Sequence, residues 1–169
     1  QIAAHPSTII MNFRIGIGYD VHRLEEGLPF VLGGVSLSHS RGPAGHSDGD
    51  VLIHAICDAM LGALALGDIG THFPDTDEEF KNIDSKILLE KTVTMIRFQG
   101  YEISNLDTTV CLQRPKISEH IQEMIIVLSG VLGIDHHQLS VKATTTEKLG
   151  FVGDESGISA YAVVLLEKV

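Results

Sequence analysis

GIGYDVHRLEEG, residues 16–27, is the stretch whose interpretation decides both the fold and the chemistry of this chain. It is either the start of a glycine-rich dinucleotide loop or a strand end that presents Asp20 and His22 to a metal ion. A dinucleotide fingerprint needs a third glycine two residues after G-x-G, followed directly by a helix. Asp20-Val21-His22 stands there instead, and the run after it contains a glycine and a proline, so the dinucleotide interpretation is rejected.

A β-strand is the prediction for the start of this region. Apolar residues occupy the odd positions from Phe13 to Tyr19, which is the period of two expected of a strand with one face buried. We therefore expect this apolar face to be buried and Asp20 to lie on the opposite face. Asp20 and His22 are two residues apart, so their side chains share a face and could grip one ion as a carboxylate and an imidazole.

Apolar patterns and capping residues predict the other elements. Ser47 followed by Asp50 has the form of a helix capping box, and an almost wholly apolar helix follows over residues 51–67. Residues 36–47 have the turn-forming composition of an exposed loop. Further helices are expected over residues 84–99 and 118–133, the second capped by Ser118 and ended by Gly133, and strands over residues 30–34, 101–113, 139–146 and 158–169. This order predicts an α/β fold in which helices cover one face of a mixed sheet.

The sheet face that the helices leave uncovered is the basis for predicting an oligomer. AYAVVLL, residues 160–166, is continuously apolar, whereas a strand with one wet face alternates apolar and polar residues. We expect another subunit to bury this face.

Length and composition indicate one soluble domain. The chain has 169 residues, of which 44% are hydrophobic and 20% charged, and no uninterrupted apolar run is long enough to span a membrane. We expect a single domain over residues 13–169 and interpret residues 1–12 as either an N-terminal extension or a remnant of cloning, without the features of a transit or signal peptide. Cys57 and Cys111 each lie in an apolar run, which favours buried thiols in a reducing compartment over a disulfide.

The acidic balance of the chain favours a metal site. A net charge of −10 disfavours nucleic acid and anionic membranes as partners, and a polyphosphate substrate would need local cations or metal. His54, on the apolar helix, is the natural third ligand beside Asp20 and His22, and three such ligands with one open position suit catalytic zinc. The alternatives are that His54 is a hydrogen-bonded core residue, that Asp50 only caps the helix, and that Asp58 is a partner behind the ligands or a charge at the helix rim.

Two further segments could bind phosphate or a base. In VKATTTEKLGF, residues 141–151, three successive threonines precede Glu147, whose carboxylate is a hard ligand suited to magnesium on a diphosphate. An exposed strand edge explains the threonines equally well. In LQRPKIS, residues 112–118, the backbone around Pro115 could recognise a base while Arg114 and Lys116 meet phosphate.

Taken together, four blocks resemble the 2-C-methyl-D-erythritol 2,4-cyclodiphosphate synthase family of the non-mevalonate isoprenoid pathway. The blocks are GYDVHRL (18–24), AGHSDGDVLIHAICDAMLGALALGDIGTHFPDTD (44–77), LQRPKIS (112–118) and VKATTTEKLGF (141–151), in the family's order. The resemblance implies conversion of 4-diphosphocytidyl-2-C-methyl-D-erythritol 2-phosphate to the 2,4-cyclodiphosphate with release of CMP, the reaction of a phosphorus–oxygen lyase.

The same resemblance implies a role for individual residues. Asp20, His22 and His54 would bind zinc, and Glu147 would bind magnesium or manganese. His46 and Thr145 would support the transition state by hydrogen bonds. The substrate-binding positions would be Ser47 at phosphate, Asp68 and Gly70 at the ribose, Phe73, Asp75 and Asp77 along the methylerythritol, and Leu112, Pro115, Lys116, Ile117, Ala143, Thr144, Thr146 and Phe151 around the cytidine and its phosphates.

The resemblance further implies a homotrimer, with its sheets around a threefold axis and active sites between neighbouring subunits. Its compartment would be the bacterial cytoplasm, with a plastid-type organelle as the alternative. Asp154 stands where an arginine is common in the family, which argues against an anion site at the trimer axis. Two other functions stay open: a zinc-dependent phosphohydrolase with a linear product, and a trimeric binding module in which zinc fastens a loop.

Overall fold

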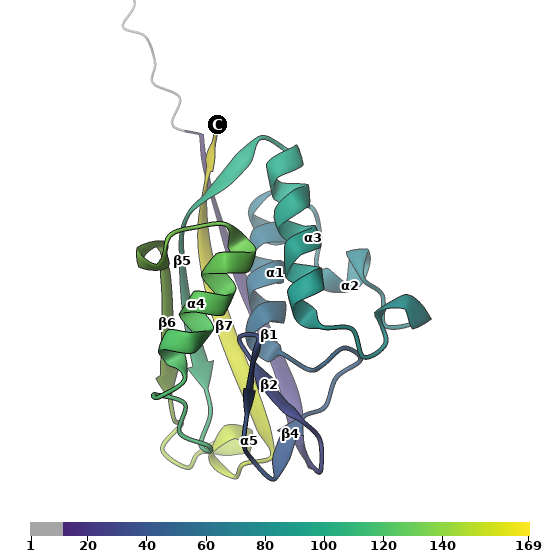
Figure 1. Cartoon of the computed structure of the whole chain (residues 1–169), viewed down its shortest axis with the longest axis vertical. Coiled ribbons are helices and arrows are strands. Elements are labelled where there is room, and N and C mark those ends of the chain that lie inside the picture. Colours follow the sequence, from purple (N-terminus) through teal and green to yellow (C-terminus); the bar gives the residue numbers. More distant parts are fainter. Residues whose placement is uncertain (1–11) are drawn as a thin grey trace, which may run out of the picture.

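A five-stranded mixed sheet forms one layer of the fold in the computed structural model, which describes residues 12–169 (Figure 1). The strand order is β4-β1-β7-β5-β6, and only the β5–β6 pair is parallel. The strands are β1 (Phe13–Glu26), β4 (Arg41–Pro43), β5 (Tyr101–Cys111), β6 (Leu139–Thr144) and β7 (Gly157–Lys168). The predicted mixed sheet is confirmed. The predicted extension, residues 1–12, lies outside the described residues except for Asn12, so its boundary stays a prediction.

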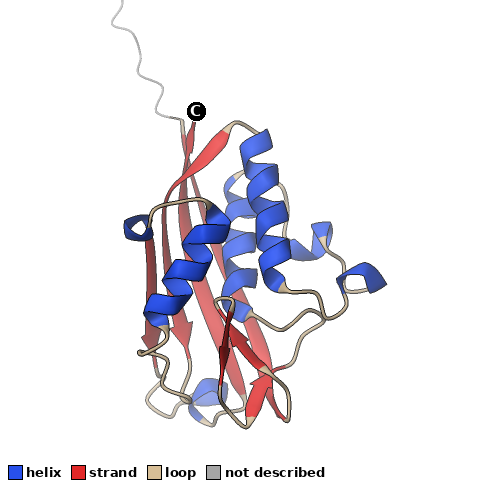
Figure 2. Cartoon of the chain, viewed as in Figure 1, coloured by secondary structure: helices blue, strands red, loops and turns tan. Residues whose placement is uncertain are grey.

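Helices form the second layer, on one face of the sheet (Figure 2). The α1 helix packs directly on β1 and β7, α3 packs beside α1, and α4 packs beside α3. The helices are α1 (Val51–Ala63), α2 (Ile69–His72), α3 (Ser85–Phe98), α4 (Ile121–Leu132) and α5 (Gly150–Gly153), with 3₁₀ turns η1 (Glu78–Phe80) and η2 (His136–Gln138). Within residues 12–169, no helix combines the length and apolar character needed to cross a bilayer.

The orientation of β1 differs from the prediction. Its apolar side chains face away from the helices, and Ile15 and Ile17 are 72% and 69% exposed, whereas Gly16 and Gly18 are buried against α1. The reason is steric. A Cβ atom on Gly16 or Gly18 would lie 1.9 Å from a backbone carbonyl oxygen of α1, so only glycine lets this helix approach the strand so closely. The two glycines of G-x-G therefore serve helix–sheet packing.

The outer face of the sheet is apolar and uncovered in the single chain. Ile17 is paired with Val163 and Tyr19 with Tyr161, and the two tyrosine rings lie 4.8 Å apart between centroids. Five apolar side chains of β1 and two of β7 are exposed on this face, namely Phe13, Ile15, Ile17, Tyr19, Val21, Tyr161 and Val163, which we call the outer patch. The outer patch is the surface that the sequence predicted another subunit would bury.

Two of the predicted helix caps are wrong. The N-cap of α1 is Asp50 rather than Ser47, and the carboxylate of Asp50 accepts hydrogen bonds from the amides of Leu52 and Ile53. The N-cap of α4 is His120 rather than Ser118. The predicted stop at Gly133 is confirmed, because this residue adopts the left-handed conformation that favours glycine.

Two predicted boundaries also change. The α1 helix ends at Ala63, four residues before the predicted end. The predicted strand at residues 30–34 is β2 (Phe30–Leu32), which forms a separate hairpin with β3 (Val35–Leu37) instead of joining the main sheet. The loop predicted over residues 36–47 contains the end of β3 and all of β4. Strands of three residues are too short to show a period in the sequence.

Candidate metal centre and adjoining cavity

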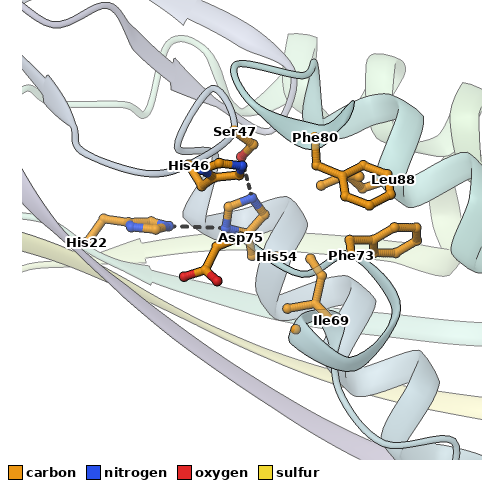
Figure 3. A pocket seen from close by; sticks show the side chains of 10 residues that line it. His22, His46, Ser47, His54, Ile69, Phe73, Asp75, Phe80 and Leu88 are labelled. Carbon is orange, nitrogen blue, oxygen red and sulfur yellow. Dashed lines mark hydrogen bonds between the residues drawn. The ribbon is translucent and has the colours of Figure 1, made fainter. Parts of the chain in front are cut away.

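Asp20, His22 and His54 converge on one point at the surface of α1. Figure 3 shows the two histidine rings of this group facing each other. The first two side chains come from β1 and the third from the first turn of α1. His22 Nε2 and His54 Nδ1 each lie 2.9 Å from Asp20 Oδ2 and 3.1 Å from each other. Among the histidine, cysteine and acidic side chains of residues 12–169, these are the three that lie close enough together to share one ion.

The three ligand atoms have the spacing that a tetrahedral metal requires. Zinc–nitrogen and zinc–oxygen bonds of about 2.0–2.1 Å place the ligand atoms of a tetrahedron roughly 3.3 Å apart. The observed separations of 2.9 and 3.1 Å are close to this value. Two imidazoles and one carboxylate are also a ligand set that zinc prefers. The donor set of this chain therefore fits a zinc ion.

The close approach of α1 to β1 produces this convergence. Gly18 lies against Ala55, which is next to His54 in the helix, and Asp20 follows two residues later on the same face of the strand. Asp50 fixes the start of the helix from the other side, since it caps α1 and its second oxygen accepts a hydrogen bond of 2.7 Å from the amide of Gly34. A helix held at both points presents His54 to the strand.

The electrostatics of the triad reflect burial opposed by pairing. Burial raises the pKa of Asp20, but hydrogen bonds from His22 and His54 lower it more, so the pKa lies well below its usual range. Burial lowers the pKa of His54, but its hydrogen bond to Asp20 and the nearby carboxylates outweigh this effect and raise it. Without an ion, the two side chains therefore favour their charged forms. A cation replacing these protons would keep the charge balance.

Two acids near the triad have structural partners. Burial raises the pKa of Asp50, which is fully enclosed by the α1 N-terminus and the β2–β3 hairpin. Burial also raises the pKa of Asp58, whose carboxylate accepts a hydrogen bond of 2.7 Å from the amide of Ile69. The structure thus makes Asp50 a capping acid and Asp58 the link between α1 and α2.

A cavity of about 360 Å³ opens beside the triad (Figure 3). Its polar wall contains His22, His54, His46 and Ser47, and Ser47 Oγ lies 2.9 Å from His54 Nε2. Three further residues predicted from the resemblance also line it, namely Gly70, Phe73 and Asp75. The apolar wall includes three residues that the sequence interpretation missed, namely Ile69, Phe80 and Leu88. They come from separate elements, and no spacing rule connects them.

Two other predicted residues have a capping role. Asp68 caps α2 and accepts hydrogen bonds from the amide and the hydroxyl of Thr71, which lower the pKa of Asp68. Asp77 caps η1 through the amide of Glu79. Neither residue is among those that line the cavity beside the triad.

The residues predicted around the cytidine lie at a different place in the chain. Pro115 and Lys116 line a second cavity, of about 570 Å³, with His39, Gln113 and Arg114. Leu112 and Ile117 are buried on either side of this loop. The carboxamide oxygen of Gln113 is buried without a hydrogen-bond partner in the structure. The loop thus brings together one hydrogen-bond acceptor, the Gln113 carboxamide oxygen, and two cationic side chains, those of Arg114 and Lys116.

The threonine segment runs from the end of β6 into α5, where Thr145 Oγ1 donates a 3.1 Å hydrogen bond to Glu147. Glu147 has a left-handed backbone, with a φ of 53°, and its side chain is exposed. Ala143 and Thr144 are exposed at the end of β6, and Thr146 and Phe151 line a small cavity on the other side of the turn.

This segment and the triad are separated by the width of the sheet. Asp20 is paired with Ala160, Ala160 with Val110, and Val110 with Ala143. Ala143 is therefore three strands away from Asp20, which corresponds to about 14 Å for a strand spacing of about 4.8 Å. One chain therefore does not bring the end of β6 to the triad, although Phe151 lines a cavity together with His22.

Comparison with known proteins assigns the chain to a family. A family model described as the YgbB family matches residues 13–167. The chain belongs to the YgbB family. It is 58% identical over 158 residues to 2-C-methyl-D-erythritol 2,4-cyclodiphosphate synthase of Bacteroides thetaiotaomicron, a match that covers 94% of this chain and 99% of that protein.

Solved structures share the YgbB-family fold. The IspF of Plasmodium falciparum, in a CDP complex, matches with a TM-score of 0.82 and 40% identity over 93% of this chain and 97% of that one. The bifunctional IspDF from Campylobacter jejuni matches with a TM-score of 0.91 and 42% identity, and this chain covers 43% of its length. The YgbB-family match includes the triad, both cavities and the β6–α5 turn, because all of them lie within residues 13–167.

Proposed function

We propose that this chain converts 4-diphosphocytidyl-2-C-methyl-D-erythritol 2-phosphate to 2-C-methyl-D-erythritol 2,4-cyclodiphosphate and CMP. The observation that carries the proposal is the metal triad beside an open cavity, in a chain 58% identical to a synthase of this name over nearly its whole length. The CDP complex of a similar structure supports a cytidine-diphosphate ligand. In this reaction an oxygen of the 2-phosphate attacks the β-phosphorus, and the bond from that phosphorus to the CMP oxygen breaks.

The metals of the proposal are zinc at Asp20, His22 and His54, and magnesium or manganese at Glu147. When bound, they supply positive charge that polarises the diphosphate and stabilises the departing CMP. Support for zinc is the ligand spacing of 2.9–3.1 Å. Support for the second metal is the chemistry of one exposed carboxylate beside a threonine hydroxyl.

The side chains of this chain mainly bind and align the substrate. Both reacting groups belong to one molecule, so holding them in line is the chief catalytic effect. His46 and Thr145 donate hydrogen bonds to phosphoryl oxygens in the proposal, and Ser47 holds the phosphate next to the triad. The apolar wall formed by Phe73 and its neighbours encloses the methylerythritol and excludes water that would compete with the 2-phosphate.

The functional unit of the proposal is a homotrimer with the active site between two subunits. Metal ions that act on one phosphoryl transfer lie about 3.5–4 Å apart. Asp20 and the end of β6 in one chain are about 14 Å apart across three strand spacings, which supports a site built from the triad of one subunit and Glu147 of the next. The outer patch supports an interface, because it exposes contiguous apolar side chains.

The proposed compartment is the bacterial cytoplasm. The relative with 58% identity is bacterial, whereas the similar Plasmodium structure is 40% identical. This difference favours the bacterial cytoplasm over a plastid-type organelle. Both cysteines are free thiols, which agrees with a reducing compartment; Cys57 is buried as predicted, whereas Cys111 is only partly buried.

Phosphorus NMR tests the proposed reaction. The purified protein is mixed with the cytidyl diphosphate substrate and magnesium, before and after zinc is removed with a chelator. We expect CMP and a cyclic diphosphate to form, to disappear on chelation and to return with added zinc. A linear phosphate product from the zinc-loaded protein would instead establish a phosphohydrolase. If the zinc-loaded protein forms no product, the binding module is the alternative that remains.

A further inference from the structure

His54 can bind a metal through Nδ1 only if its ring is held in one orientation. The Nδ1 atom faces Asp20 at 2.9 Å, and the other ring nitrogen, Nε2, points away from the metal centre into the protein. A neutral imidazole carries one proton, so Nδ1 has a free lone pair for a metal when Nε2 holds that proton. The groups that face Nε2 therefore determine whether His54 is ready to bind.

Ser85 faces this nitrogen from another element. Its hydroxyl oxygen lies 3.1 Å from His54 Nε2, and Ser85 is completely buried as the first residue of α3. Asp48 holds Ser85 in place, since one carboxylate oxygen accepts a 3.1 Å hydrogen bond from the amide of Ser85 and the other accepts its hydroxyl proton. Asp48 is itself fixed, because its amide donates to the carbonyl of Ile83 at 3.1 Å.

The direction of these hydrogen bonds follows from the number of protons. A serine hydroxyl has one proton and two acceptor lone pairs, and an ionised carboxylate only accepts. Because Asp48 takes the proton of Ser85, the Ser85 oxygen cannot donate to Nε2. It can only accept, from Nε2 of His54 and from the hydroxyl of Ser47, which lies 3.1 Å away. The chain Asp48–Ser85–His54 thus keeps a proton on Nε2, so that an ion replacing the Nδ1 proton meets the Nδ1 lone pair at the position shared with Asp20 and His22.

We propose that Asp48 and Ser85 are positioning residues that fix the ring orientation and tautomer of His54 for metal binding. The proposal rests on the proposed zinc site of this chain. Partners that accept the second N–H of a metal-bound histidine generally raise metal affinity by 10–100-fold. Ser47 also lies near Nε2, at 2.9 Å, but its hydroxyl is at the cavity wall, where a substrate can take its proton. Ser85 has no such exposure, so its hydrogen bond persists when substrate binds.

The first test measures zinc binding without substrate, by competition between the protein and a chelator of known affinity. We expect Ser85→Ala to weaken zinc binding by about 10–100-fold. Asp48→Asn removes one of the two acceptor oxygens that hold Ser85, so we expect a smaller loss. Because Asp48 acts through Ser85, the double variant should bind zinc no more weakly than Ser85→Ala alone. Additive losses, or unchanged zinc affinity in either single variant, would overturn the proposal.

A matched control separates positioning from a general loss of a buried hydroxyl. Ser129 is also a buried serine, but its hydroxyl donates to the carbonyl of Ile125 within α4. We expect Ser129→Ala to leave zinc affinity unchanged. If Ser85→Ala does not fold, Asp48→Asn decides the question by itself.

NMR of ¹⁵N-labelled histidine reports directly on the His54 Nε2 proton, whose signal would not change if Ser85 only stabilised the fold. In the zinc-loaded wild type, the His54 Nε2 proton should be visible and exchange slowly with water. In Ser85→Ala it should shift and exchange faster, and an unchanged signal would overturn the proposal. A wild type that binds zinc but forms no cyclic product would refute the proposed function and leave this inference standing.

Discussion

At the scale of single residues, the metal centre consists of three ligand atoms whose lone pairs repel one another unless a proton or a metal ion lies between them. Two imidazole nitrogens and a carboxylate oxygen lie 2.9–3.1 Å apart with little access to water. Burying such groups unpaired is costly, so the arrangement is stable only when positive charge is present. This charge requirement makes Asp20, the anionic ligand, the residue on which metal binding depends most.

Asp20→Asn should lose zinc and turnover together. The substitution keeps the size of the side chain but removes its charge, so we expect a loss of zinc affinity above the 10–100-fold that an outer partner typically contributes. Chelator competition and CMP release measure the two effects. Asp107→Asn is the matched control, because Asp107 is a half-exposed strand carboxylate whose partner is Lys142. Near-normal activity in Asp20→Asn would remove Asp20 from the ligand set.

Asp50 gives the fold a pH dependence of predictable sign. Burial raises the pKa of Asp50 above 3.8, the value of an exposed aspartate. Between these two pKa values the folded chain keeps a proton that the unfolded chain has lost, so the stability of the folded state falls as pH rises from the lower value to the higher one. Asp50→Asn lacks this titration. Its amide NH₂ group would also oppose the amide of Gly34, at a cost of about 1–3 kcal/mol. Urea unfolding from about pH 4 to pH 8 measures the free energy of unfolding of wild type and variant, and we expect the difference between the two to shrink as pH rises. A difference that stays constant with pH would contradict the role given to Asp50.

At the scale of elements, the two glycines of β1 decide how far α1 stands from the sheet. Gly18→Ala would place a Cβ atom 1.9 Å from the carbonyl oxygen of Ala55, which is backbone and cannot rotate away. We expect a loss of about 3 kcal/mol in stability and weaker zinc binding, because the shifted helix carries His54. Chemical denaturation and chelator competition measure the two effects.

Replacement of a glycine by alanine in α4 should raise the stability of the protein, whereas Gly18→Ala should lower it. Gly130 lies in α4 with no atom within 4 Å of an added Cβ. Gly130→Ala should therefore stabilise the protein by about 0.5–1 kcal/mol, the usual preference of a helix for alanine. If both alanine variants lose the same stability, close packing is not the role of Gly18.

The elements were predictable where a local signal existed. The order of the long elements, the stop at Gly133 and the pair Asp20 and His22 followed from the sequence, because periodicity, a left-handed turn and side-chain spacing are local properties. His54, 34 residues from Asp20, was proposed on a different ground, because an imidazole on an apolar helix needs a polar partner. The buried face of β1 was assigned wrongly, because its apolar residues were taken as the core face. The true inner face is made of glycine, which carries no hydrophobic signal. Ser85 was missed because its partner, His54, is 31 residues away.

At the scale of the whole molecule, the uncovered outer patch and the divided site have one explanation. The triad lies on β1 and α1, and the threonine–glutamate segment follows β6, at the opposite edge of the same sheet. The proposed homotrimer accounts for both, since its subunits would bury their outer patches against one another and place the β6 end of one subunit at the triad of the next. The assembly would thus complete the active site as well as cover apolar surface.

Mixing two inactive variants tests this arrangement. Asp20→Asn lacks one half of the site and Glu147→Gln the other, so each should be inactive as a uniform trimer. In trimers reassembled from equal amounts, a site is intact when its triad comes from a Glu147→Gln chain and its Glu147 from an Asp20→Asn chain. Random assembly gives this combination at about one site in four, so CMP release should recover to about a quarter of the wild-type rate. If both halves came from the same chain, every site would carry a defect and mixing would restore nothing.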